Sequence, residues 1–538
     1  MADSNNEGFT GSDAHAVNGK LPGADAHYDL VVVGAGPAGL AAALEAAATG
    51  ATVLLVDEHP VSAAQMGNDV PYWFGGRMTG AVQAKARMIE QVFMAEPLFE
   101  QAFEAGIDVQ LGVYAWGLWR NRANLGALPE PMLGLADEER SWTVGFKAIV
   151  LATGARDLAL AFDGWAQPGV MGAQGLHALL TRYDAFAGRR VVILGSGDLA
   201  LDTARLALDK GLEVAALVEV ETAPQGDPAK VAALQAAGVA IHCGTVIRGA
   251  PSGIDGVRAA VIAPVAGDGP LVTLDCDTIC MAVDVVPAIE LLDVAGGRIV
   301  TDSARGGHVP QAPAGAALPG VFIAGDCAGL GQSREQAAAQ GRAVARQALG
   351  LEQVPEQVPE QVHADSAPQA FDRLAYRQAW LRALVSATPE TVHVCQCEDV
   401  SRADLLGVQP PQYLPRPEKL GCRSLETLLA DGPPDQEQIK RLTRACMGAC
   451  QARRCREQVG MLLAMGSNLP VEQAPRAGWR APVRPLALKV LADRDEAEAM
   501  REGWDVWFGI PTQWTPYRDI GTVREAMHRE ALGGNMHL

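Results

Sequence analysis

The chain has few of the features that mark a nucleic-acid-binding, secreted or membrane-spanning protein. Acidic residues outnumber basic ones by 63 to 44, which gives a formal net charge of -19, and Lys and Arg form no basic stripe of the kind that phosphate binding needs. The N-terminus has no apolar stretch behind a basic region, and no window of about 18 residues is uncharged and apolar. We therefore expect a cytoplasmic protein with no membrane span and no nucleic-acid partner.

The sequence also offers no obvious catalytic acid and base, and no Cys-x-x-Cys pair near its glycine-rich motifs. Cys276 and Cys280 are separated by three residues and fall in a predicted strand and loop, which disfavours a disulfide reductase. Six of the ten cysteines lie between residues 395 and 455. In a reducing compartment, such a cluster favours metal ligands or redox groups over structural disulfides.

A strand followed at once by glycines and a helix of small residues predicts a dinucleotide site near the N-terminus. The motif residues are Gly34, Gly36, Pro37, Ala38 and Gly39. Gly34 permits a tight turn, Gly36 lets the backbone approach a pyrophosphate, and Gly39 allows close helix packing, while the helix N-terminus supplies partial positive charge. A second strand ends at Asp57, which would accept hydrogen bonds from ribose hydroxyls, and the adjacent Glu58 belongs to the same predicted site.

Two further segments resemble motifs of the glutathione-reductase type of flavoprotein and imply that this nucleotide is FAD. Residues 149–155, Ile-Val-Leu-Ala-Thr-Gly-Ala, resemble the segment that crosses between that family's FAD and NAD domains. Residues 321–326, Val-Phe-Ile-Ala-Gly-Asp, resemble its C-terminal flavin motif, in which the aspartate contacts the ribityl chain. The resemblance adds four residues to the predicted FAD site: Thr153, Gly154, Gly325 and Asp326.

A second strand, turn and helix of the same kind occupies residues 191–210. Gly195 and Gly197 stand at the turn, and a following strand leads to Glu219, which would accept ribose hydroxyls and repel a 2'-phosphate. Asp198 places a negative charge close to the expected pyrophosphate position. The sequence therefore leaves three possibilities open for this fold: NAD, another adenine nucleotide, or no ligand.

The clustered cysteines have the spacing Cys395-x-Cys397, some fifty residues, and Cys450-x4-Cys455, with Cys446 among those left unassigned. Four thiolates can hold zinc or a [2Fe-2S] cluster, because both accept tetrahedral sulfur ligation, but Cys-x-Cys is unusual for zinc. Basic residues surround the second pair, and they could offset thiolate charge, dock a partner or form a solvated helix face. They are Lys440, Arg441, Arg444, Arg453, Arg454 and Arg456; Cys422 is also unassigned.

Residues 394–400 and 441–455 resemble the [2Fe-2S] module related to bacterioferritin-associated ferredoxin. The likeness is to the version in the larger (alpha) subunits of opine oxidase, hydrogen cyanide synthase, dye-linked proline dehydrogenase, sarcosine oxidase and related amine dehydrogenases, and it extends from about residue 28 to 492. Cys446 stands where that family usually has glycine, so it is either a bystander or a replacement for Cys450. The ligands that the resemblance implies are Cys395, Cys397, Cys450 and Cys455.

This resemblance implies a function as the electron-relay subunit of a heteromeric flavin-dependent amine or amino-acid dehydrogenase or oxidase. In such assemblies a smaller FAD-containing subunit of the D-amino-acid-oxidase type oxidises a secondary amine or amino acid, and electrons then pass through the cluster and the second FAD. Some relatives also bind FMN between subunits. A stand-alone NAD(P)H-dependent FAD and [2Fe-2S] reductase is the alternative, and a non-enzymatic cluster carrier is a third reading.

The predicted fold class is α/β, a flavoprotein with two dinucleotide-binding domains like glutathione or thioredoxin reductase, plus a small, mostly helical [2Fe-2S] module. At 538 residues the chain exceeds a single core. In the module we expect helices over 371–386 and around Asp404, Glu426 and Glu437. The predicted divisions are a disordered leader (1–27), an FAD-binding domain (28–160 and 300–350), a second Rossmann-like, NAD-type domain (161–299), a Pro-containing linker (351–367), the helical module (368–465) and a tail (466–538) that packs on a partner or on the chain itself.

Overall fold

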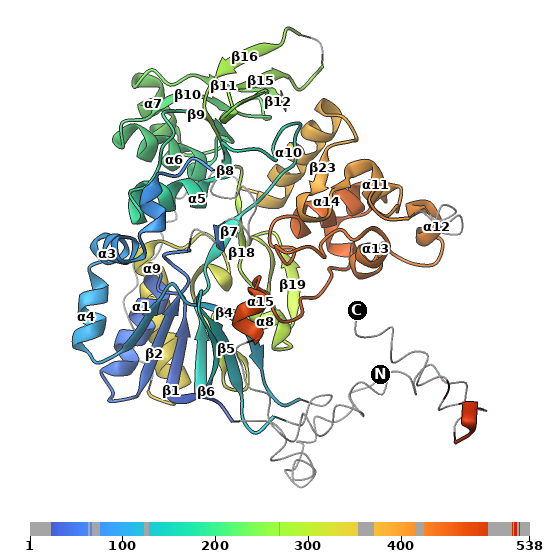
Figure 1. The fold of residues 1–538 in the computed structure, drawn as a ribbon. Coiled ribbons are helices and arrows are strands. Elements are labelled where there is room, and N and C mark those ends of the chain that lie inside the picture. The colour runs from blue at the N-terminus through green and yellow to red at the C-terminus, as the bar shows by residue number, and fades with distance from the viewer. Residues whose placement is uncertain are drawn as a thin grey trace.

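The computed structural model describes residues 23–62, 65–66, 76–122, 128–267, 269–352, 371–415, 424–492, 519, 521–524 and 527. Nearly all of the predicted leader and linker, Cys422, and Trp504, Trp507 and Trp514 of the tail lie outside the described residues. Figure 1 shows an N-terminal α/β unit, a second α/β unit above it, and a group of helices from the C-terminal third beside both.

The first unit is built on an eight-stranded sheet whose central strands are parallel. Its main path runs β21-β22-β6-β1-β2-β3, and β4 and β5 extend it through β6. Residues 30–33 of β1 are buried, as expected for a parallel strand covered on both faces. The strands are β1 (Ala26–Val33), β2 (Val53–Asp57), β3 (Asp108–Leu111), β4 (Tyr114–Trp119), β5 (Met132–Ala136), β6 (Ser141–Leu151), β21 (Gly315–Leu318) and β22 (Val321–Ile323). Strand β1 begins at Ala26, two residues before the predicted start of the FAD-binding domain at residue 28, and Ala26 pairs with Val144 of β6.

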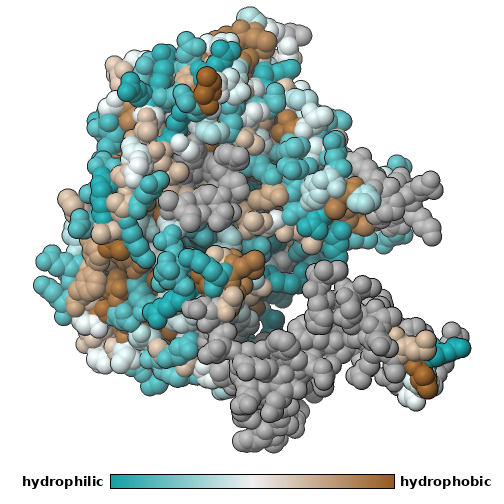
Figure 2. Space-filling view, viewed as in Figure 1, coloured by the Kyte–Doolittle hydropathy of each residue, from teal (hydrophilic) through white to brown (hydrophobic). Residues whose placement is uncertain are grey.

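Helices α1 (Pro37–Ala47) and α9 (Arg334–Ala348) pack against each other beside this sheet (Figure 1). They approach so closely that a Cβ on Gly341 would lie 2.0 Å from the carbonyl oxygen of Ala38. The other elements of this unit are α3 (Lys85–Ala95), α4 (Leu98–Glu104), α8 (Glu290–Val294), β19 (Ile299–Asp302) and β20 (Gly307–Pro310). Figure 2 shows small apolar patches among polar side chains on one face of the molecule.

The second unit has a five-stranded parallel sheet in the order β11-β10-β9-β17-β8. A short antiparallel ribbon, β7 (Ala155–Asp157) with β18 (Val285–Pro287), connects it to the first unit. The predicted pair of α/β dinucleotide-binding folds is therefore confirmed. The elements are β8 (Val170–Gly172), β9 (Arg190–Leu194), β10 (Glu213–Val218), β11 (Ile241–His242), β17 (Thr278–Met281), α5 (Ala173–His177), α6 (Asp198–Asp209), α7 (Pro228–Ala236), and the smaller strands β12 (Thr245–Gly249), β13 (Ser252–Gly253), β14 (Gly256–Val257), β15 (Ala259–Pro264) and β16 (Val272–Asp275).

The C-terminal third contains the predicted helices and one short antiparallel strand pair, β23–β24, that was not predicted. Its elements are α10 (Arg373–Ala387), β23 (His393–Cys395), β24 (Val400–Ser401), α11 (Arg402–Leu406), α12 (Leu425–Leu429), α13 (Gln436–Thr443) and α14 (Arg456–Gly466). Ser401 and Ser424 begin α11 and α12 with capping boxes. One continuous cluster of buried apolar side chains joins these helices to both α/β units, so the structure does not show a separate module.

After α14 the chain returns to the first unit. We call residues 476–492 the C-terminal strap. Val483 N donates to the carbonyl oxygen of Trp116 in β4 at 2.8 Å, and Ser141 in β6 donates to the carbonyl oxygen of Val490 in α15 (Leu488–Ala492). The strap therefore lies on the chain's own surface. Among the described residues, no helix is long and apolar enough to cross a membrane.

Candidate functional site

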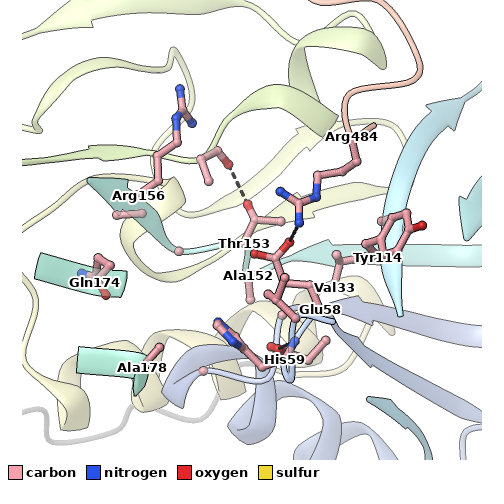
Figure 3. Close-up of a pocket in the computed structure, with 18 of the residues that line it drawn as sticks. Val33, Glu58, His59, Tyr114, Ala152, Thr153, Arg156, Gln174, Ala178 and Arg484 are labelled. Carbon is pink, nitrogen blue, oxygen red and sulfur yellow. Dashed lines mark hydrogen bonds and ion pairs between the residues drawn. The ribbon is translucent and has the colours of Figure 1, made fainter. Parts of the chain in front are cut away.

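A cavity of about 330 Å³ opens at the carboxyl ends of the strands of the first sheet (Figure 3). That volume lies in the range of small-molecule sites, roughly 300 to 1,000 Å³. Eight of the eleven residues predicted for the first site line it: Gly34, Gly36, Pro37, Asp57, Glu58, Thr153, Gly154 and Asp326. Ala38, Gly39 and Gly325 lie behind the wall, and burial raises the pKa of the Asp326 carboxyl.

The glycine turn after β1 has the geometry that its sequence predicts. Gly34 has φ +104°, and a Cβ there would lie 2.2 Å from the carbonyl oxygen of Ala152. A Cβ on Gly36, in contrast, would meet nothing within 4 Å. The turn is thus closed on the protein side and open on the cavity side, as close approach of a pyrophosphate to the backbone requires.

The two acidic residues after β2 have different partners. Asp57 accepts hydrogen bonds from the backbone N–H groups of Ala35, at 2.6 Å, and His59, at 2.8 Å. Glu58 forms an ion pair at 2.7 Å with Arg484 of the C-terminal strap (Figure 3), and Arg453 lies 3.9 Å from its other oxygen. The strap and the loop between Cys450 and Cys455 therefore both reach the rim of the cavity.

The partly buried His59 lines the same cavity and pairs with the buried Tyr183. The His59 Nδ1 atom is hydrogen-bonded to the Tyr183 hydroxyl, which also accepts from the N–H of Val61. Burial lowers the pKa of His59 to about 4 and raises that of Tyr183. At neutral pH His59 is therefore an uncharged hydrogen-bonding group on the cavity wall. The glycine motifs gave no signal for it.

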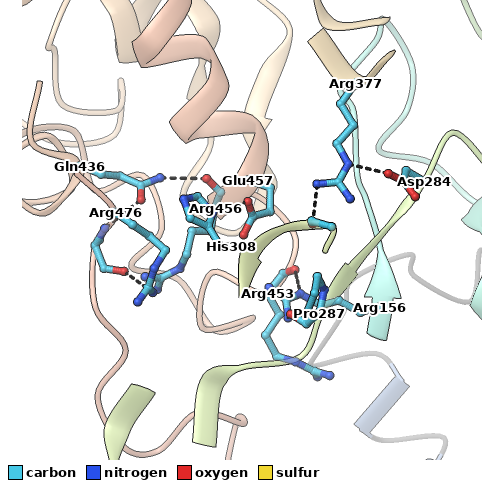
Figure 4. Close-up of polar contacts among 12 residues, drawn as sticks. Arg156, Asp284, Pro287, His308, Arg377, Gln436, Arg453, Arg456, Glu457 and Arg476 are labelled. Atoms are coloured by element: carbon cyan, nitrogen blue, oxygen red, sulfur yellow. Dashed lines mark hydrogen bonds and ion pairs between the residues drawn. The ribbon is translucent and has the colours of Figure 1, made fainter. Parts of the chain in front are cut away.

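Arg156 connects the cavity to the cysteine loop (Figure 4). Its Nε donates to the carbonyl oxygen of Arg453 at 2.8 Å, and its Nη1 forms a buried ion pair with Glu290. Its Nη2 is buried without a hydrogen-bond partner in the described part of the chain. Arg156 directly follows the Ala-Thr-Gly-Ala segment, and this position was the only signal that the sequence gave for it.

Five cysteine thiols converge in the C-terminal third. The Cys455 sulfur lies 3.9 Å from that of Cys395 and 3.5 Å from that of Cys446. Cys450 accepts hydrogen bonds from the thiols of Cys397 and Cys455, which hold its pKa well below its usual range. All are buried except Cys397, which is partly exposed. The structure thus brings together the four predicted ligands and adds Cys446 to them.

The loop that carries three of these cysteines has an unusual backbone. Four residues other than glycine have positive φ: Arg444, Cys446, Gln451 and Ala452. Such conformations cost on the order of 1 kcal/mol or more each. They persist only where the surrounding structure holds them in place, and they cluster at functional sites. Gly448 lies so close to Cys397 that an added Cβ would be 2.3 Å from the Cys397 Cβ. The loop is therefore shaped around the sulfur atoms.

The basic residues near the cysteines divide into two groups. Arg441 pairs with Glu437 on the surface of α13, as a solvated helix face would. Arg454 and Arg456 are instead buried, with their guanidinium groups over the rings of Trp165, at 5.0 Å, and Trp479, at 3.6 Å. The prediction of a solvated helix face is therefore wrong for these two arginines, because thiols and indole rings surround their side chains.

The described residues contain no group of three or more His, Cys, Asp or Glu side chains arranged to hold a metal ion. The sulfur atoms instead contact one another, and that of Cys455 lies near those of both Cys395 and Cys446. Their chemistry nevertheless suits a thiolate-ligated cluster, because soft sulfur donors are concentrated in a buried site beside two guanidinium groups.

The residues predicted for the second nucleotide site form the expected turn. Gly195, with φ +112°, and Gly197 lie between β9 and α6, and Glu219 follows β10. None of the three lines the cavity of the first unit. Glu219 is fully buried and hydrogen-bonded to Ser196 and to Tyr376 of α10, a contact that the sequence did not predict.

Comparisons with known proteins agree with the two α/β folds. Residues 28–343 match the model of the pyridine nucleotide-disulphide oxidoreductases. The chain is 26% identical to an opine oxidase subunit of Agrobacterium tumefaciens over 494 residues, which cover 86% of this chain and 91% of that one. It is 28% identical to the alpha subunit of sarcosine oxidase from a Corynebacterium species over 534 residues, 95% of this chain but only 50% of that protein. The predicted resemblance to the larger subunits of these oxidases is confirmed.

A solved structure, that of L-proline dehydrogenase from P. horikoshii, has a similar fold. The TM-score is 0.57 at 18% identity, and the match covers 86% of this chain and 79% of that one.

Proposed function

Since this chain belongs to the pyridine nucleotide-disulphide oxidoreductase family and is an oxidoreductase, we propose that it is the electron-relay subunit of a hetero-oligomeric dehydrogenase or oxidase. In this proposal it holds FAD in the cavity of the first unit and a [2Fe-2S] cluster on its clustered cysteines. The opine oxidase and sarcosine oxidase relatives are named as subunits of oxidases, which supports an assembly of different chains.

The observation that carries the proposal is the position of Arg453. It stands between Cys450 and Cys455 and also lines the cavity that contains the glycine turn. Its carbonyl oxygen accepts from Arg156, another residue of the cavity wall. The cysteine site and the cavity thus share a wall, and the rate of electron transfer falls steeply with distance. This shared wall supports a direct exchange of electrons between groups bound at these two places.

The residues of the cavity suit FAD. Gly34, Gly36 and the N-terminus of α1 would receive the pyrophosphate, and Asp57 would turn toward the ribose hydroxyls. Thr153 and Asp326 would lie along the rest of the cofactor. A flavin can exchange two electrons with one partner and single electrons with another. The chain's own contribution is to bind and orient it, with the neutral His59 and the Arg484–Glu58 pair at the cavity wall.

The proposed cluster ligands are Cys395, Cys397, Cys450 and Cys455. Burial of the sulfur site, two buried arginines and a strained ligand loop support a thiolate-ligated group here. The Cys395-x-Cys397 spacing, which is unusual for zinc, favours the cluster. A [2Fe-2S] cluster transfers single electrons. Cys446, whose sulfur contacts that of Cys455, remains the alternative to Cys450.

The substrate would be oxidised on a partner, which we propose to be a smaller FAD-containing subunit of the D-amino-acid-oxidase type. The substrate class proposed is a secondary amine or amino acid. The proteins named for opines, sarcosine and L-proline support this class. In the proposed assembly, FMN bound at the interface between the subunits would be a further electron carrier.

Affinity purification of the tagged full-length chain from its native cells, without oxygen, tests the proposal. We expect a second flavoprotein to co-purify, and the flavin absorbance of the complex to bleach with sarcosine, L-proline or an opine. The chain separated from its partner should not respond to these amines. Bleaching of the isolated chain by NADH alone would favour the stand-alone reductase instead.

A further inference from the structure

The second dinucleotide-binding fold is filled by the chain's own side chains. Glu219, at the position where a ribose would bind, is fully buried, and so is Ser196 of the glycine turn. In the first unit the corresponding Asp57 and Glu58 line an open cavity. A carboxylate that receives a ribose must face such an opening. Glu219 does not.

Tyr376 of α10 occupies the place beside Glu219. Its hydroxyl donates to Glu219 Oε2 at 2.6 Å and accepts from the N–H of Ser196 at 3.2 Å. The Ser196 hydroxyl donates to the same carboxylate oxygen at 2.5 Å, and the N–H of Glu221 donates to Oε1 at 2.8 Å. Asp57 of the first unit accepts only from backbone N–H groups in the hydrogen bonds described above, whereas a side chain from another helix, the phenol of Tyr376, lies against the carboxylate of Glu219. A single phenol bridges the acidic residue and the glycine turn, the two features that bind a nucleotide in this fold.

Tyr376 is held firmly in this position. Arg373, one helical turn before it, and Arg377, the next residue, both pair with Asp284, and the Arg377 Nε contact is 2.7 Å. Arg377 also donates to the carbonyl oxygens of Gly306 and Val285 (Figure 4). Asp284 is buried, so breaking these contacts would leave an uncompensated charge in the interior. Helix α10 is thus fixed to the fold that Tyr376 closes.

A second obstruction lies at the N-terminus of α6. Gln225 N donates to the Ser196 hydroxyl, and Gly226 N donates to the carbonyl oxygen of Ser196 at 2.9 Å. A Cβ on Gly226 would come within 2.9 Å of the first helical nitrogen, that of Asp198. A pyrophosphate needs access to these N–H groups, and here a turn of the chain and the Asp198 carboxylate stand beside them.

From this geometry we infer that the second dinucleotide-binding fold takes no NAD(H), NADP(H) or free adenine nucleotide, because Tyr376 replaces the nucleoside. The fold instead has a structural role: α10 is fixed to it, and the helices around the cysteines pack against α10. The consequence for electron flow rests on the proposed function: hydride from NAD(P)H does not enter here, and electrons arrive from a partner chain. The exclusion of nucleotides does not depend on the cluster.

Isothermal titration of the full-length, FAD-loaded chain with NADH and with AMP tests the inference. We expect no binding to the wild type and no bleaching of its flavin by NADH. Tyr376→Phe keeps the ring in place and should also bind nothing. Tyr376→Ala should bind AMP detectably, with a dissociation constant at least about tenfold below the lower limit set for the wild type, the factor for one returned hydrogen bond of about 1.4 kcal/mol. Arg382→Ala, at an exposed position of α10, is the matched control and should behave as wild type.

Binding of NADH or AMP to the wild type would overturn the inference. A Tyr376→Ala variant with normal flavin content and melting temperature but no gain in affinity would show that Tyr376 is not the obstacle. Neither outcome bears on whether the chain holds a [2Fe-2S] cluster, because the cluster is measured separately from the iron and acid-labile sulfide contents.

Discussion

The Nε atom of Arg156 donates to the carbonyl oxygen of Arg453 at 2.8 Å, which joins the wall of the proposed flavin cavity to the loop between Cys450 and Cys455. The same guanidinium is paired with the buried Glu290. One side chain thus connects two regions that lie almost three hundred residues apart in sequence, and substitutions around it should affect both stability and cofactor binding.

Removing Arg156 should destabilise the protein strongly. Arg156→Met leaves the Glu290 charge buried without its partner, which typically costs about 3 to 5 kcal/mol of unfolding free energy. Adding Glu290→Gln should recover part of that loss, since the amide carries no charge. Urea unfolding of the FAD-loaded protein measures both. Lys230→Met, which breaks an exposed pair with Asp202, is the control and should cost less than about 1 kcal/mol. An Arg156→Met variant as mild as this control would contradict the account.

The local motifs could be predicted from the sequence because each depends on neighbouring residues. The turn at Gly34 and the acidic residue after β2 are both set by short-range chemistry. The helices predicted around Asp404 and Glu426 likewise follow local patterns, and they begin with capping boxes at Ser401 and Ser424. The hydrogen bond between Tyr376 and Glu219 spans 157 positions, and no local pattern indicates it. Long-range contacts of this kind decide whether a dinucleotide-binding fold is open.

The basic residues near the cysteines show a second limit of prediction from the sequence. Arg454 and Arg456 stand on either side of Cys455, where α14 begins, in a charged stretch, which is typical of a solvated face. Their burial depends on Trp165 and Trp479, which come from distant segments. The predicted domain boundaries and site residues remain predictions, although the structure places the four predicted ligand thiols together.

Cysteine replacements should separate the ligands from the bystander. Cys446→Gly restores the residue usual in the resembled family and should keep the EPR signal of a reduced [2Fe-2S] cluster. Cys395→Ser and Cys450→Ser should lose it, together with iron and acid-labile sulfide, because a cluster needs four protein ligands. If Cys446→Gly loses the signal and Cys450→Ser keeps it, the ligand is Cys446.

Arg484 should contribute to FAD retention. It neutralises Glu58 at the cavity rim, and Arg484→Met would leave a carboxylate unbalanced beside an anionic cofactor. We expect the dissociation constant of FAD to rise about tenfold, equivalent to about 1.4 kcal/mol. Lys489→Met, an exposed charge on the same strap, should leave it unchanged. Equal flavin affinity in the two variants would mean that the strap does not act on the cofactor.

His59 should make stability depend on pH. Its pKa falls from 6.5 to about 4 on folding because it is buried. The unfolded chain then binds the proton more readily, so this contribution is complete above about pH 6.5 and is lost as the pH falls toward 4. Between about pH 8 and pH 5, wild type should lose about 2 kcal/mol more unfolding free energy than His59→Gln.

The comparison with His59→Gln removes the effect of Asp157. Burial raises the pKa of that carboxyl to about 7, so its contribution is present at low pH and declines as the pH rises through 7. Because Asp157 is common to both proteins, its opposing contribution cancels in the difference. Identical pH profiles for wild type and His59→Gln would place His59 in a solvated position.

Rapid-freeze EPR of the assembled complex, mixed with its amine substrate without an external acceptor, tests the relay most directly. The account predicts that the signal of the reduced [2Fe-2S] cluster rises as the flavin absorbance falls, and that Cys455→Ser abolishes the signal while substrate still reduces the partner's flavin. Reduction of all flavin in the complex with no cluster signal, in a preparation that contains iron and sulfide, would contradict it.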